Sequence, residues 1–205
     1  MGPRTPLTSP SQYFSTSRGP LVPGLAVFAG YALGQVVAVY LVARWLLATV
    51  EGLPPEVPSM LPSMLPGLLV GMLIVATVAL FVVATIMHFG VGSSASGSFT
   101  EALAVAAWAY APNLLVIPLE LAWIRYQLQG LTIEAESPAA FEAAIDGYLE
   151  SMSTVPDLVM SLAVIGWSVW ILAWGVTSTH EVDFSRALFP AAIVGVGALL
   201  LIVLA

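Results

Sequence analysis

The stretch from His88 to Pro118 constrains the fold more than any other part of the chain. It consists of a Gly/Ser-rich connector between two long apolar segments, the second of which contains prolines. The connector is too polar to lie in lipid, and the flanking segments are too apolar to lie in water. This window therefore predicts two membrane helices joined by a tight turn. Ser98 and Glu101, at the start of the second helix, have the spacing of a capping box.

The composition indicates the same environment for the whole chain. Of 205 residues, 59% are hydrophobic and only 8% are charged, whereas a water-soluble domain carries about a quarter charged residues. The absence of cysteine excludes disulfides and thiolate metal sites. The chain has 12 acidic residues, five arginines and no lysine. This balance favours a halophilic source, with a small-sample effect as the alternative, and it excludes nucleic acid as a partner.

Five apolar runs are long enough to cross a bilayer, which takes about 20 helical residues. The predicted fold class is therefore all-α, a polytopic membrane helix bundle with five transmembrane helices. Residues 1–20 form a polar tail that is expected to be partly disordered, up to about Ser9. The membrane domain occupies residues 21–205, with helices expected at about 22–48, 67–87, 99–124, 158–176 and 184–205.

Two connections carry further predictions. The proline-rich segment 51–66 is expected to interrupt the helical structure, because proline removes a backbone donor. The loop after the third membrane helix is expected to hold an amphipathic surface helix at about 138–152, with Ser137 as its N-cap and Pro138 at its first position.

The charge distribution gives an orientation. An odd number of spans places the two termini on opposite sides of the membrane. The positive-inside rule then favours a cytoplasmic amino terminus and an external carboxyl terminus in the cell membrane. The margin is three arginines against two: Arg4, Arg18 and Arg186 against Arg44 and Arg125.

Small residues at four-residue spacing mark helix-packing faces. Gly30 and Gly34 lie in the first membrane helix, and Gly67 and Gly71 begin the second. Such rows allow close approach of helix backbones in lipid. Packing within the bundle is the favoured interpretation, and a homo-oligomer interface is the alternative.

Polar residues in the third membrane helix are candidate functional groups. Asn113 and Glu120 are seven residues apart and share one face, and the neighbouring Pro112 and Pro118 are expected to kink the helix. An ion path through Glu120 is one interpretation. The favoured one is an ion pair near the helix end, because a lone carboxylate in lipid is costly. The possible partners are Arg44 and Arg125.

Histidines occur only twice, at the ends of two helices. His88 and His180 are expected on the same side of the membrane as Glu101. They form no recognised metal motif, so no metal site is expected. A nucleophile elbow, a phosphate-binding loop and a dinucleotide fingerprint are also missing from the sequence. We therefore expect a protein that is not an enzyme and that carries no cofactor.

Several motifs along the chain form a recognisable set. They are Pro10 with Tyr13-Phe14, His88 with the following Gly/Ser turn and Ser98-Phe99, the run from Trp108 to Pro112, and His180 followed by the run from Phe184 to Ala187. This set resembles the Yip family of membrane proteins, named for interaction with Ypt/Rab GTPases, and specifically its prokaryotic branch. The resemblance implies five membrane helices and a cytoplasmic amino terminus. In eukaryotic relatives it implies roles in vesicle traffic and membrane shaping, and it supplies no catalytic residues.

The sequence therefore favours a non-enzymatic protein that organises membranes or partner proteins. Its expected contacts are the lipid bilayer and protein partners whose identity the sequence does not give. The alternative is a permease for a small solute or ion that uses Asn113 and Glu120 beside the proline breaks.

Overall fold

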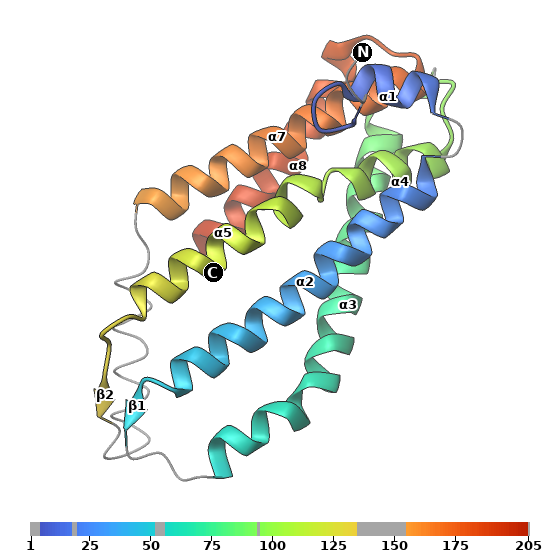
Figure 1. Ribbon diagram of the computed structural model, residues 1–205. Coiled ribbons are helices and arrows are strands. Elements are labelled where there is room, and N and C mark those ends of the chain that lie inside the picture. Colours follow the sequence, from blue (N-terminus) through green and yellow to red (C-terminus); the bar gives the residue numbers. More distant parts are fainter. Residues whose placement is uncertain (1–4, 18–19, 52–55, 94, 135–154, 205) are drawn as a thin grey trace.

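The structure is a computed structural model that describes residues 5–17, 20–51, 56–93, 95–134 and 155–204. Five helical segments are long and apolar enough to cross a membrane, which confirms the predicted fold class (Figure 1). Four of them are the single helices α2 (Leu21–Leu47), α3 (Glu56–Gly90), α7 (Val155–His180) and α8 (Phe184–Leu204). The remaining span is built from α4 (Phe99–Trp108) and α5 (Ala111–Gln127).

A short helix and a short strand pair lie at opposite ends of the bundle (Figure 1). Helix α1 (Pro10–Thr16) lies where α2, α4 and α8 begin and where α3 and α7 end; we call this the α1 end. Strands β1 (Val50–Glu51) and β2 (Ile133–Glu134) pair in parallel at the other end, which we call the β end. The surface helix expected at 138–152 lies outside the described residues.

The expectation of a disordered tail up to Ser9 is wrong for residues 5–9. Pro6 and Pro10 are fully buried, and the Leu7 carbonyl accepts a hydrogen bond of 2.9 Å from Trp167 Nε1. The segment is polar overall, but its few apolar side chains gain burial by packing against α7.

The predicted interruption at 51–66 is also wrong from residue 56 onward, because α3 already begins at Glu56 and contains Pro62 and Pro66. A proline inside a helix removes one hydrogen bond and leaves the carbonyl four residues earlier without its donor. The prolines are four residues apart, so these lost bonds fall on one side of the helix. Neighbouring bonds on the other side keep the segment helical.

The third membrane span is interrupted once, between Trp108 and Ala111. Pro112 has no N–H to donate to the Trp108 carbonyl, so the α-helical ladder breaks there. Pro118 lies inside α5 without ending it. Of the two predicted kinks, Pro112 therefore marks a break between helices, whereas helix α5 continues through Pro118.

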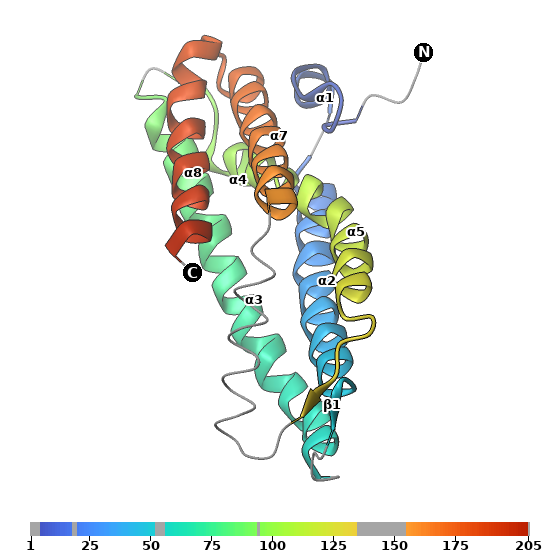
Figure 2. The same cartoon turned by 90° about the vertical axis from the view of Figure 1, so that its left-hand side faces the viewer.

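The core of the bundle is concentrated toward the α1 end. Helix α4 lies within it, with Ala102, Ala104 and the run 105–107 all fully buried. Larger side chains from other elements surround this alanine-rich helix, including Phe14, Met87 and Ile171. Helices α7 and α8 pack as an antiparallel hairpin, while α3 runs obliquely from beside α8 at the α1 end to beside α2 near the β end (Figure 2).

Candidate functional site

The two histidines of the chain meet at the α1 end. His88 is in the last turn of α3 and His180 is the last residue of α7, 92 residues further along. His88 Nδ1 lies 3.1 Å from His180 Nε2, which is hydrogen-bond distance. His180 is completely buried, whereas His88 is partly exposed. The structure thus joins two residues that the sequence placed only on the same side of the membrane.

The surrounding bonds fix which nitrogen carries the proton. The Thr179 hydroxyl donates its single proton to the Gly175 carbonyl at 3.0 Å, so its oxygen can only accept from His180 Nδ1, 2.9 Å away. In neutral His180 the Nε2 atom is then an acceptor, and His88 Nδ1 must be the donor. The result is a directed chain of hydrogen bonds from the partly exposed His88 to a backbone carbonyl inside α7.

The connector between α3 and α4 is held against His180. The Ser96 amide donates to the His180 carbonyl at 3.2 Å. A Cβ atom built on Gly97 would lie 2.4 Å from the His180 ring, so only glycine allows the connector to approach so closely. The three parts that meet at this site are the end of α3, the connector and the end of α7.

Glu101 takes part in capping the N-terminus of α4. Its carboxylate accepts hydrogen bonds from the Ser98 amide (2.7 Å) and the Ser98 hydroxyl (2.9 Å), and its own amide donates to the Ser98 hydroxyl. The predicted capping box is therefore present. It holds the connector at its α4 end, as His180 does in its middle.

Helix α1 packs onto the same end of the bundle. The Tyr13 ring meets Trp108 edge-on, with a centroid distance of 5.4 Å. Phe14 is 5% exposed and packs against α7 at Gly175, where an added Cβ would lie 3.1 Å from the phenyl ring. Sequence analysis missed this docking; the signal was the pair of adjacent aromatic residues in an otherwise polar tail.

The predicted polar pair of the third span lies elsewhere. Asn113 is half-buried at the start of α5, and Glu120 is exposed near its middle. Arg125, one suggested partner, lies over the Trp45 ring at 5.6 Å from its centroid.

A serine side chain of α7 forms a hydrogen bond with the backbone at the α4–α5 break. Ser168 of α7 donates its hydroxyl proton to the Ala109 carbonyl at 2.8 Å. This carbonyl belongs to the interrupted turn before Pro112, where backbone groups need partners from outside the helix. Proline breaks in membrane helices are commonly compensated in this way, so Ser168 ties the break to the neighbouring helix.

The four predicted packing glycines divide into two groups. Gly30 and Gly34 lie at the α2–α5 contact, where an added Cβ would come within 3.4 Å of Leu114 and 2.9 Å of Ile117, respectively. Gly67 and Gly71 meet nothing within 4 Å. The expected packing role within the bundle is therefore wrong for these two glycines, because α3 diverges from its neighbours there.

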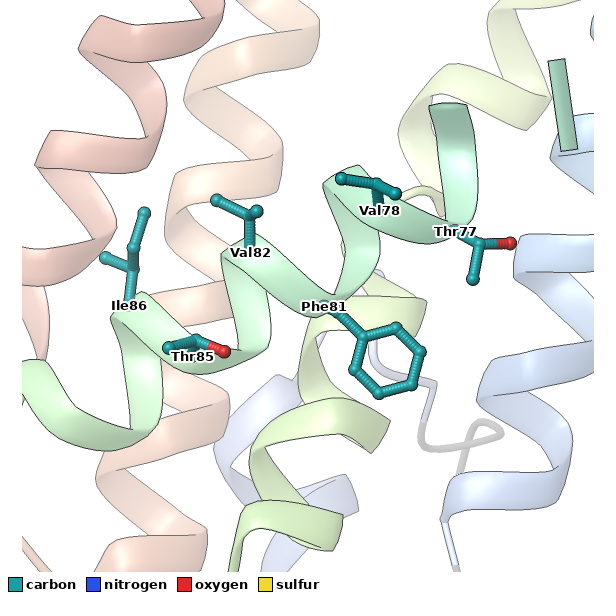
Figure 3. A pocket seen from close by; sticks show the side chains of 6 residues that line it. All are labelled: Thr77, Val78, Phe81, Val82, Thr85 and Ile86. Atoms are coloured by element: carbon teal, nitrogen blue, oxygen red, sulfur yellow. The ribbon is translucent and has the colours of Figure 1, made fainter. Parts of the chain in front are cut away.

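Two hollows lie on the surface of the described chain outside these contacts. One, of about 430 Å³, is a furrow on α3 alone, and its side chains point outward from one helix (Figure 3). The other, of about 560 Å³, lies at the α1 end between the connector and the start of α8. Ser93, Ser185 and Arg186 give this second pocket a polar lining. Across the described ranges, no three His, Asp or Glu side chains gather in a way that could hold a metal ion.

These features define a class: a multi-pass membrane protein whose polar contacts gather at one end of a helix bundle. A sequence model of the family described as the Yip1 domain matches residues 5–205, nearly the whole chain. The chain therefore belongs to the Yip1 domain family. Comparison of this chain with curated proteins and with solved structures found no match.

Proposed function

We propose that this protein is a non-enzymatic membrane scaffold that holds partner proteins at its α1 end. The observation that carries the proposal is the way the polar groups there are used. His180, Ser98 and Glu101 bond to other groups of the chain and join α3, the connector, α4 and α7. Such an arrangement favours a fixed surface over a reaction centre, which needs accessible groups.

The surface that binds a partner would combine α1 with the pocket between the connector and the start of α8. Gln12, Ser15 and Thr16 of α1 are exposed, as are Ser185 and Arg186 at the start of α8. Burial of Phe14 on the opposite side of α1 holds this helix in place. A polar surface on a rigid support is suited to recognising a folded protein, because little flexibility is lost on binding.

The orientation and setting belong to the same proposal. The α1 end would face the cytoplasm and the carboxyl terminus the outside of the cell membrane, as the arginine distribution favours. The acidic, lysine-free composition supports a halophilic source. A homo-oligomer is one form that the scaffold could take.

Site-specific photo-crosslinking in native membranes tests the proposal. A photoreactive amino acid at Ser15, exposed on α1, is compared with the same residue at Gln129, exposed at the β end. We expect a reproducible protein adduct, identified by mass spectrometry, from Ser15 alone. Equal adducts from both positions, or none from Ser15, would contradict the proposal.

Proteoliposomes distinguish the scaffold from the permease. Vesicles holding the intact chain or its Glu120→Gln variant are assayed for proton, sodium and potassium flux. We expect both to match empty vesicles. Flux that needs the Glu120 carboxylate would overturn the scaffold interpretation in favour of an ion path.

A further inference from the structure

A groove opens between α2 and α3 toward the surrounding lipid. It has a volume of about 530 Å³, within the range of small-molecule sites in proteins. Helices α2 and α3 form its two sides, and Tyr110, at the α4–α5 break, also lines it. We call it the α2–α3 groove; its lining residues are Tyr31, Ala32, Gln35, Gly67, Leu68, Gly71, Met72, Val75, Ala76, Ala79 and Tyr110.

Small side chains on α3 keep the groove open. Gly67, Gly71, Val75 and Ala79 follow one another at four-residue spacing, so they form one row along the helix. An added Cβ at Gly67 or Gly71 would meet nothing within 4 Å. These glycines are therefore not required for contacts within the described chain, and larger residues in their place would fill the groove.

Three polar side chains lie along this otherwise apolar surface. They are Tyr31 and Gln35 of α2 and Tyr110 at the break, and the two tyrosine rings are 5.0 Å apart. Tyr31 is ten residues from the start of α2, or about 15 Å along the helix, which is close to the middle of a 30 Å bilayer core. In the part of the chain that the structure describes, no hydrogen bond is seen for these three side chains.

Polar groups without partners at this depth are costly, because lipid chains cannot replace the hydrogen bonds of water. A ligand that brings a hydrogen-bonding atom to the same depth would remove that cost. The phosphates of ordinary lipids lie at the interface, about 15 Å away along the helix axis.

We propose that the α2–α3 groove binds a neutral lipid: one long apolar chain that ends in an uncharged hydroxyl or carbonyl group. The chain would lie along Gly71 and Met72, and its oxygen would bond to Tyr31, Gln35 or Tyr110. The inference is independent of the scaffold proposal.

Photolabelling tests this site directly. The purified chain in lipid nanodiscs is exposed to hexadecanol carrying a diazirine, and in parallel to hexadecane carrying the same group at the same position. Labelled residues are mapped by mass spectrometry. We expect the alcohol to label the groove residues Leu68, Met72 and Val75 at least about fivefold more than the alkane, the free-energy equivalent of about 1 kcal/mol or one hydrogen bond.

Two variants and a control make the result specific. Gly71→Leu should reduce labelling by the alcohol to the level of the alkane, because it fills the groove. Gly197→Leu on α8 is the matched control, since an added Cβ there also meets nothing within 4 Å, and it should change nothing. Gln35→Leu combined with Tyr31→Phe and Tyr110→Phe keeps the groove but should remove the preference for the alcohol.

Three results would overturn the proposal. Equal labelling by the two probes would indicate ordinary contact with bulk lipid. Undiminished labelling of the Gly71→Leu variant would place the probe elsewhere. Crosslinks between two copies through Met72, lost in the same variant, would show a second chain in the groove instead.

Discussion

Replacement of Gly97 by alanine would place a methyl group against the buried ring of His180. The new Cβ would lie 2.4 Å from Cγ, 2.5 Å from Nδ1 and 2.7 Å from Cδ2 of that ring. Favourable carbon contacts begin at about 3.5 Å, so one partner must recede by about 1 Å. The ring cannot easily move, because it is fully buried and hydrogen-bonded to His88 and Thr179.

The connector must therefore move, and its movement strains the bond from the Ser96 amide to the His180 carbonyl. Overpacking costs about 1–3 kcal/mol, and a lost hydrogen bond adds about 1 kcal/mol. We expect the free energy of unfolding to fall by about 2–4 kcal/mol and the melting temperature by on the order of 10 °C. Thermal unfolding in detergent, followed by tryptophan fluorescence, measures both.

A double-mutant cycle checks the cause. His180→Ala removes the ring, so Gly97→Ala should cost less than about 0.5 kcal/mol in that background. Gly166→Ala on α7, where an added Cβ meets nothing within 4 Å, is the control and should not destabilise the protein. An equal cost of Gly97→Ala with and without the His180 ring would refute the reasoning.

Three further substitutions test other contacts. His88→Leu should cost about 1–3 kcal/mol because His180 Nε2 is left buried without a donor, whereas His88→Asn, which retains an N–H donor, should recover part of that loss. The same unfolding assay compares the two variants, and equal costs would contradict a stabilising hydrogen bond between His88 and His180. Ser168→Ala should cost about 0.6–1.7 kcal/mol through the lost bond to the Ala109 carbonyl, and an unchanged melting temperature would argue against that bond. Phe14→Ala should release α1 while the membrane helices stay folded, because Phe14 is the most buried aromatic residue of that helix; faster hydrogen exchange confined to residues 10–16 is expected, and unchanged exchange would contradict the docking.

Several elements of the fold could be predicted because their signals are local. The capping box depends on two residues three apart, Ser98 and Glu101, and both partners are visible in the sequence. The break before Pro112 follows from a missing N–H. The prediction that α3 begins only after Pro66 is wrong because rules for isolated helices assign each proline its full cost in helix stability. Pro62 and Pro66 are nevertheless tolerated inside α3.

Only part of the candidate site could be predicted from the sequence. Sequence spacing placed His88 and His180 on one side of the membrane, but the rotation of α3 about its axis decides whether His88 faces α7 or lipid. The same limit applies to the glycines. Gly30 and Gly67 look alike in sequence, yet one lies against α5 and the other lines an open groove.

By itself the sequence determined the environment and the number of spans. Long apolar runs with few charges can satisfy their backbone only as helices in lipid, so length and composition suffice for that conclusion. The tertiary structure decided which helix faces meet: the bond between His88 and His180, the close approach of Gly97, and the divergence of α3 that opens the α2–α3 groove. Apolar helix faces in lipid differ little in their preference for one neighbour over another, and the choice depends on packing shape across the whole bundle.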